Sequence, residues 1–187
     1  MASDNFMWFP QDGGSPIQGE TTDQYFTKKG AFEVSTFKFS LEGEEATEGK
    51  SQSGSSGKAK FGSFTIEKRV DSASVPLYKA CCQATIFPSI MLAVRMQGGS
   101  NLLYLQYIFR YNQVVGVEWQ GGSAEDRATE TVTFIFKAMG VQYIPQGADG
   151  KEGTKQQWSW NTSNQGAPGL SISGIEGPPS FLTGTGK

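Results

Sequence analysis

Short blocks of this sequence alternate between large apolar side chains and a mixed second set, and this alternation restricts the fold more than any other feature. Val132, Phe134 and Phe136 alternate with Thr133 and Ile135. Because successive side chains of a strand point to opposite faces, one face of this block is apolar throughout and should pack on a core. Phe, Tyr and Trp make up 12% of the chain, and most lie in similar blocks between glycine-rich connections. The pattern is typical of an all-β sandwich or barrel.

Seven segments are expected to be strands of a mostly β domain. In chain order they are Phe6–Phe9, Phe32–Leu41, Lys60–Arg69, Thr85–Gln97, Leu102–Trp119, Thr129–Ile144 and Gln156–Thr162. A break at Gly140 is expected within the sixth segment. These strands leave room for very little helix.

The segment from Leu102 to Phe109 is apolar on both faces of a strand, so both faces should be covered. One interpretation is a central strand that lies under a helix. The other is that a neighbouring subunit covers the outer face. The sequence alone does not separate these two arrangements.

One short helix is expected to begin near Ser74, whose hydroxyl can cap free N–H groups, with Pro76 in the first turn. Small or apolar residues then recur at spacings of three and four and form one stripe: Leu77, Ala80, Cys81 and Ala84. The stripe explains Cys81 as a small buried hydrophobic residue. A redox role for this cysteine is therefore not expected.

Composition argues against several classes of function. Sixteen Lys and Arg against eighteen Asp and Glu give a net charge of −2, which leaves no strong field to attract nucleic acid or an anionic membrane. Histidine is absent, and with it the commonest general base and the commonest zinc ligand. We therefore expect no enzyme activity, no metal and no cofactor.

Two local patterns that could carry chemistry are rejected. Residues 43–51 resemble a phosphate-binding loop, but five residues separate the glycines where that loop has four, and the intervening acids would repel phosphates. The only dense acidic set near aromatic strands is Glu118, Glu125, Asp126 and Glu130. We expect Glu125, Asp126 and Arg127 to fix a turn through local hydrogen bonds or ion pairs instead of forming a hydrolytic carboxylate pair.

The chain is expected to be soluble and synthesised in a reducing compartment. Cys81 and Cys82 are adjacent and cannot reach ordinary disulfide geometry without strain. Residues 1–5 carry an acid in place of a basic n-region, and no apolar h-region follows them. No run approaches the roughly 18 apolar residues of a membrane helix. Export, where it occurs, should need no cleaved signal peptide.

Two segments lack strand patterning. Residues 42–62 are rich in Gly, Ser, Glu and Lys and should form a long exposed loop between two strands. Residues 164–187 contain many Gly and Pro and should form a tail beyond a domain that spans residues 1–163. Five apolar tail residues are expected to hold the tail against a groove or a neighbouring chain: Leu170, Ile172, Ile175, Phe181 and Leu182.

Motifs between residues 5 and 161 follow the order of one known family. In chain order they are Q-G-E-T-T-D at Gln18–Asp23, S-Q-S-G-S at Ser51–Ser55 before F-T-I-E-K at Phe64–Lys68, the helix residues Asp71, Pro76, Leu77 and Cys81, G-G-S-A-E-D-R-A-T-E at Gly121–Glu130, and A-D-G at Ala148–Gly150 before W-S-W-N at Trp158–Asn161. The block Gly121–Glu130 is the most specific. Together the motifs resemble the haemolysin-coregulated proteins (Hcp), the tube subunits of type VI secretion systems.

The resemblance implies a β-barrel of two sheets with one short flanking helix. It also implies six subunits that close into a ring, and rings that stack into a hollow tube. In that family a contractile sheath drives the tube, a spike protein sits at its tip, and small effector proteins travel in its lumen. The implied location is the bacterial cytoplasm before firing and the outside of the cell, or a target cell, afterwards.

The resemblance also suggests where the subunit makes contacts. In the strand Phe32–Leu41, Lys38 falls where the family places a lumen-facing residue. Glu125, Asp126 and Arg127 would form a structural turn or a subunit contact. Polar residues of the long loop are expected to join stacked rings: Glu44, Glu45, Lys50, Ser51, Ser53, Ser55 and Lys58.

Two alternatives stay open at this point. A tube subunit of a phage tail or of an extracellular contractile injection particle would share the architecture. A secreted β-sandwich that binds a ligand through its aromatic residues would also fit the composition, but it should be monomeric.

Overall fold

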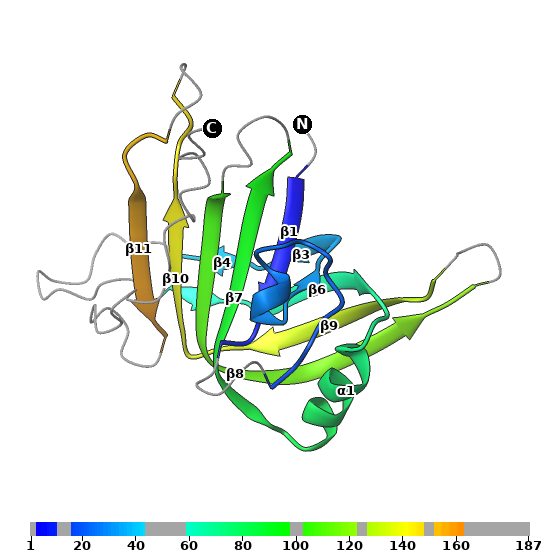
Figure 1. Cartoon of the computed structure of the whole chain (residues 1–187). Helices are drawn as coiled ribbons and strands as arrows, with labels where there is room; N and C mark the ends of the chain where they lie inside the picture. Colours follow the sequence, from blue (N-terminus) through cyan, green and yellow to red (C-terminus); the bar gives the residue numbers. More distant parts are fainter. Residues whose placement is uncertain are drawn as a thin grey trace, which may run out of the picture.

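The computed structural model of the chain describes residues 3–10, 16–43, 59–97, 103–122, 127–147 and 152–162. Figure 1 shows a mostly β molecule with one α-helix among these residues. The elements are β1 Ser3–Trp8, the 3-10 helix η1 Thr27–Lys29, β2 Phe32–Glu33, β3 Thr36–Lys38, β4 Leu41–Glu42, β5 Lys60–Phe61, β6 Phe64–Arg69, α1 Ser74–Cys82, β7 Ile86–Met96, β8 Leu103–Gln120, β9 Thr129–Ile135, β10 Ala138–Tyr143 and β11 Gln156–Asn161. The fold class predicted from the alternation is confirmed.

The strands form a barrel of two layers that share β8. One layer contains β1, β7, the first half of β8, β10 and β11, and the other contains the second half of β8, β9, β6 and β3. The chain from β2 to β3 closes the barrel, because β2 pairs with β1 while β3 pairs with β6. The short strands β4 and β5 form a separate ribbon.

A bend in β8 moves this strand from one layer to the other. Tyr111 has a φ of 53°, which is uncommon for a residue with a side chain. The buried Asn112 amide donates a hydrogen bond to the Phe109 carbonyl at 2.8 Å, and the Lys137 N–H donates to the Arg110 carbonyl at 3.0 Å. The segment that pairs with β8 turns opposite this bend: β9 ends at Ile135 and β10 begins at Ala138.

The predicted break at Gly140 is therefore in the wrong place. Gly140 lies inside β10, paired with Ile108 on one side and Ser159 on the other. The chain turns instead at residues 136–137, opposite the bend of β8. The segment predicted as one strand from Phe32 to Leu41 is likewise divided into β2, β3 and the start of β4.

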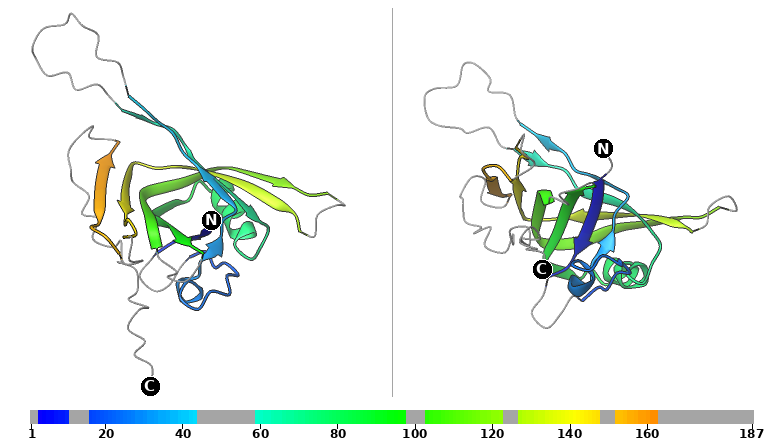
Figure 2. Two further views of the ribbon diagram at one scale, coloured as in Figure 1. Left: turned by 90° about the horizontal axis from the view of Figure 1, so that it is seen from above. Right: turned by 45° about the horizontal axis from the view of Figure 1, so that its top comes forward.

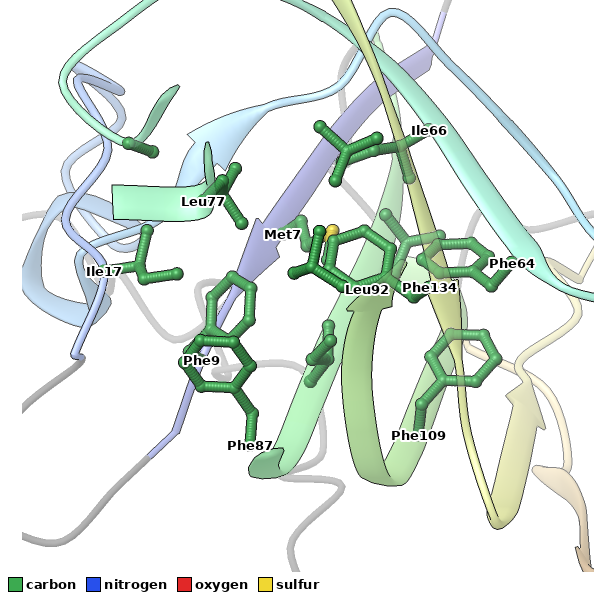
Figure 3. Packing of buried hydrophobic residues seen from close by; sticks show 14 of the residues in the cluster. Met7, Phe9, Ile17, Phe64, Ile66, Leu77, Phe87, Leu92, Phe109 and Phe134 are labelled. Atoms are coloured by element: carbon green, nitrogen blue, oxygen red, sulfur yellow. The ribbon is translucent and has the colours of Figure 1, made fainter. Parts of the chain in front are cut away.

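The main core lies between the two layers and is rich in aromatic rings. Figure 3 shows Phe64, Phe109 and Phe134 together, with Leu77 of α1 and Met7 of β1 in the same cluster. The rings of Phe64 and Phe109 stack with centroids 4.4 Å apart. Burying a large side chain of this kind contributes about 1.5–3 kcal/mol, so the interior apolar face predicted for β9 stabilises the fold directly.

A second cluster covers the opposite face of β1, β7 and β8. Phe6 and Phe26 stack with centroids 4.1 Å apart, and Trp8 and Ile108 belong to the same cluster. The cover comes from the segment around η1, which contributes Phe26. The apolar outer face predicted around Leu102–Phe109 is thus covered at Ile108, but an α-helix is not what covers it.

Helix α1 forms where it was predicted, with a different cap. Ala73 is the N-cap residue and makes no side-chain capping bond, whereas Asp71 accepts a hydrogen bond from the Ala73 N–H at 2.9 Å. The Ser74 hydroxyl donates to Glu130 at 2.7 Å and accepts from the Asp71 N–H at 2.9 Å, so the N–H group that it binds precedes the helix. Ala84 lies beyond the helix, exposed and with a φ of 50°, so the apolar stripe ends at Cys81.

A buried charge network fastens α1 to both β6 and β9. The Lys68 Nζ lies 2.9 Å from Glu130 Oε1 and 2.6 Å from Asp71 Oδ1, and it donates to the Arg69 carbonyl at 2.7 Å. The side chains of Lys68 and Glu130 are both fully buried. Trp119 of β8 donates its indole N–H to the second oxygen of Glu130 at 2.7 Å. Four elements therefore meet at one ion pair.

Replacing one partner of this pair should be strongly destabilising. Lys68→Met leaves the Glu130 charge buried without its cation, which costs about 3–5 kcal/mol in comparable cases. Urea unfolding of the purified protein measures the loss. Lys79→Met is the control, since Lys79 is an exposed lysine on α1. A Lys68→Met protein that is as stable as this control would contradict the interpretation.

Arg95 joins β7 to β1 and to the segment that precedes η1. Its guanidinium contacts Asp23 at 2.6 Å and Asp4 at 3.0 Å, and lies 4.9 Å from the ring of Phe6. Burial raises the pKa of the Asp23 carboxyl, but the hydrogen bond from Arg95, two backbone N–H donors and the charge of Arg95 outweigh burial and hold that pKa below its ordinary value.

This lowered pKa predicts a pH-dependent contribution to stability. A carboxyl with a depressed folded-state pKa stabilises the protein above its unfolded pKa, and the contribution disappears as pH falls through the folded value. Asp23→Asn should therefore be less stable than the parent near neutral pH, with the difference shrinking below about pH 4. Denaturant unfolding across pH tests this, with Glu42→Gln as an exposed control. A difference that stays constant down to acid pH would argue against it.

Candidate assembly surface

The outer face of the second layer is polar across every strand. Phe64, Ile66 and Lys68 of β6 point inward, so the residues between them point away from the core. The same alternation on β3, β8 and β9 gives the outward set, named here the polar face: Thr36, Lys38, Thr65, Glu67, Arg69, Gly116, Glu118, Gln120, Thr129, Thr131 and Thr133. This sheet presents hydroxyl and charged groups to its surroundings, and no helix formed by the described residues lies over them.

Hydrogen bonds across the strands hold the side chains of the polar face. Thr36 donates its hydroxyl to Glu67 at 3.0 Å, and the hydroxyls of Thr65 and Thr133 lie 3.3 Å apart. Such cross-strand pairs stabilise a sheet modestly and fix its register. The face is therefore an ordered surface of short polar groups.

The layer that carries the polar face has two edges. Among the described residues, β3 pairs only with β6. At the other end, β7 pairs with β8 only as far as Ile86 opposite Gln113, so residues 114–120 of β8 pair with β9 alone. Because all three pairings between these strands are antiparallel, β3 and β8 run in opposite directions. Figure 1 shows the β8–β9 hairpin extending away from the barrel.

Lys38 lies on the polar face at the β3 edge. Its neighbours Phe37 and Phe39 pack inward, with ring centroids 5.9 and 5.5 Å from that of Tyr107. Lys38 itself is exposed. At the β8 edge, Glu118 is also exposed on the polar face. The two edges thus carry opposite charges.

Glu118 and Glu130, the described carboxylates among those considered for hydrolysis, do not face one another. Glu118 pairs with Thr131 and lies on the polar face, whereas Glu130 pairs with Trp119 and points into the core toward Lys68. In the part of the chain that the structure describes, no group of three or more His, Cys, Asp or Glu side chains could hold a metal ion.

The residues predicted for ring stacking lie outside the described residues, as do Glu125, Asp126 and the apolar tail residues. The strands β4 and β5 flank the undescribed part of the long loop, and they pair Leu41 with Phe61 and Glu42 with Lys60. Figure 2 shows this ribbon leaving the barrel in a different direction from the β8–β9 hairpin. The loop is therefore carried on a protruding ribbon.

A polar hollow of about 740 Å³ lies between β1, the chain near Glu20 and the end of β6. Its carboxylates already have partners: Glu20 accepts from the Ser72 N–H at 3.0 Å, and Glu33 accepts from the Thr21 hydroxyl at 3.3 Å. Arg127 reaches Glu20 at 3.7 Å, with both side chains at least half exposed. These contacts connect loops and give no catalytic arrangement.

The family resemblance identified Lys38, but most of the polar face was not identified from the sequence. The alternation that identified the inward Phe and Ile residues of β6 and β9 also marks Thr65, Thr131 and Thr133 as outward. A row of threonines on one face was the available signal. The two sheet edges carry no comparable signal, because they depend on which strands pair.

The fold and this surface define a class: a two-layer β-barrel that presents a polar sheet with open edges. Comparison with known proteins gives the family. The family model described as "Type VI secretion system effector, Hcp" matches residues 6–143. The chain belongs to this family of type VI secretion tube proteins.

Individual relatives agree with this assignment. Protein hcp1 of Pseudomonas aeruginosa is 38% identical over 101 residues, which cover 53% of this chain and 61% of that protein. The chain thus aligns with less than two thirds of this relative's length. A solved structure of a type six secretion system protein has a TM-score of 0.77 at 28% identity and covers 88% of this chain and 99% of its own. Hcp1 from Salmonella typhimurium has a TM-score of 0.68 at 25% identity, covering 88% and 98%.

The described part of the chain contains no helix that is long and apolar enough to cross a membrane.

The exposed contact between Arg127 and Glu20 should contribute little to stability. Solvent screens the attraction, so Arg127→Ala should change the free energy of unfolding by no more than about 1 kcal/mol. Urea unfolding at a protein concentration with constant oligomeric state measures this, with Arg127→Lys as the charge-preserving control. A loss of several kcal/mol specific to the alanine variant would show that Arg127 fixes the turn.

Proposed function

We propose that this chain is a structural subunit that closes into hexameric rings, which stack into the inner tube of a type VI secretion system. The observation that carries the proposal is the polar face with its two antiparallel edges. The polar face lines the lumen, and the subunit has no catalytic role. Family membership supports the tube, and the resemblance supplies the ring of six.

The edges explain how a ring can close. An uncovered strand edge presents unpaired N–H and C=O groups, which a strand from another chain can satisfy. In the proposed ring, β3 of one subunit pairs with residues 114–120 of β8 of the next. Because β3 and β8 run in opposite directions, the antiparallel order continues from subunit to subunit. A contact between two different patches is heterologous and generates a ring when its rotation closes.

Charge supports this pairing over a random edge contact. Lys38 lies on the β3 edge and Glu118 on the β8 edge, and neither makes an ion pair within the described residues. A lysine on an edge strand discourages pairing with an unsuited partner. Within one subunit the register aligns Lys38 with Gly116 across the sheet, two residues from Glu118 on β8. Strands that close into a barrel are staggered, and a stagger of this size would bring Lys38 of one subunit beside Glu118 of the next.

Other parts of the chain fit the proposed tube. The ribbon of β4 and β5 would carry the long loop, with Glu44, Lys50 and Lys58, to the next ring. Lys38 would face cargo, so small effector proteins with acidic surfaces are the favoured passengers. A contractile sheath would surround the tube, a spike protein would cap it, and firing would export the subunit without a cleaved signal peptide.

Reversing the edge charges should test the ring directly. Lys38→Glu or Glu118→Lys alone would place like charges across the interface and shift the protein from rings to single subunits. The double variant should restore rings, since the pair is re-formed with exchanged signs. Negative-stain electron microscopy and native mass spectrometry report the species. Lys79→Glu, on α1 away from both edges, is the control, and rings that persist in both single variants would refute this pairing.

A further inference from the structure

The first layer ends in an aromatic face on β10 and β11 that the tube proposal does not use. The register places Tyr107, Val141 and Trp158 in one row and Phe109, Met139 and Trp160 in the next. Phe109 and Met139 belong to the buried core, so the apolar surface continues outward from the core to the edge strand. There Trp158 is 46% and Tyr143 is 43% exposed.

The geometry of this face suits a flat apolar ligand. The rings of Trp158 and Trp160 are stacked with centroids 5.5 Å apart and an interplanar angle of 20°. Tyr104 meets Tyr143 edge-on at 6.5 Å beside them. Exposed aromatic surfaces of this kind are typical of interaction sites, and aromatic-lined grooves bind proline-rich segments in extended form.

The sequence that follows β11 contains such a segment. Strand β11 ends at Asn161, and Thr162 is fixed by two bonds to the Lys137 carbonyl, at 2.8 Å from its N–H and 2.7 Å from its hydroxyl. The residues that follow include Pro178-Pro179 and Phe181, with Glu176 and Lys187 as the charged residues after Thr162. The chain from residue 163 to Pro178 can span up to about 50 Å, which is ample for a return to Trp158.

We infer that the aromatic face of Tyr143, Trp158 and Trp160 is the docking site for the C-terminal segment of the same chain, with Pro178, Pro179 and Phe181 against the rings. Proline restricts the unbound chain, which lowers the entropy lost on docking. Both solved relatives align over nearly their whole length but over 88% of this chain. The inference rests on the proposed tube subunit only for its setting, since the docking contact lies within one chain.

Photo-crosslinking in the full-length protein tests this placement. A benzoylphenylalanine introduced at position 181 should form adducts that peptide mass spectrometry maps to β10 or β11. A denaturing gel should show them at the mass of one chain, because the contact is within a chain. Trp158→Ala should lower the adduct yield about fivefold, the size expected for losing one aromatic contact, whereas Trp158→Phe should retain it. Pro178→Ala with Pro179→Ala should also lower the yield.

Control variants separate this inference from the ring proposal. Tyr78→Ala removes another half-exposed aromatic side chain, on α1, and should leave the adduct unchanged. Adducts mapped to other elements, adducts at the mass of two chains, or a yield that Trp158→Ala leaves unchanged would each overturn the inference. Imaging of the same samples reports rings independently, so a failure of docking and a failure of ring closure give different results.

Discussion

The bend of β8 is the constraint on which the rest of the molecule depends. One strand of 18 residues serves both layers, so the angle between the layers is set by a few hydrogen bonds at residues 109–113. Asn112 is fully buried there, and its side-chain amide donates to the Phe109 carbonyl across the bend. Because β9 and β10 follow β8 on either side of the bend, the same turn also separates the polar sheet from the aromatic end of the barrel.

The buried pair of Lys68 and Glu130 has a different role. Two charges lose much hydration when they are buried, so such a pair contributes less net stability than its short distance suggests. It does restrict where α1 can lie, since Asp71 and Ser74 of the helix start both bind the same network. The helix can then support the β8–β9 hairpin at Trp119 while the outer face of that hairpin stays free of cover. The main effect of this network is therefore to position α1, and its net contribution to stability is smaller.

Sequence patterns predicted the parts of the structure that depend on local periodicity. Most of the strands and the position of α1 follow from residue spacing, whereas Lys38 was named through the family resemblance. The break near Gly140 and the capping role of Ser74 were wrong for a shared reason: both residues have the right type for their predicted task, but tertiary contacts use them otherwise. Gly140 fits between two paired strands, and the Ser74 hydroxyl is held by Glu130, which is 56 residues away in the chain. Long-range pairing of this kind leaves no local pattern, so the sheet edges also could not be predicted.

A subunit that assembles through sheet edges must avoid pairing with the wrong partner before assembly. Each edge of the polar layer carries one charged side chain, Lys38 on β3 and Glu118 on β8. Both side chains also belong to the proposed lumen surface. An isolated lysine or glutamate beside an open edge disfavours contact with a like edge and with apolar strands. When the two edges come from successive subunits in the proposed ring, the same charges attract each other. The residues that keep the free subunit from aggregating would then also select the correct neighbour. The other charged residues of the face, Glu67 and Arg69, lie on the inner strand β6 and have no part in this selection.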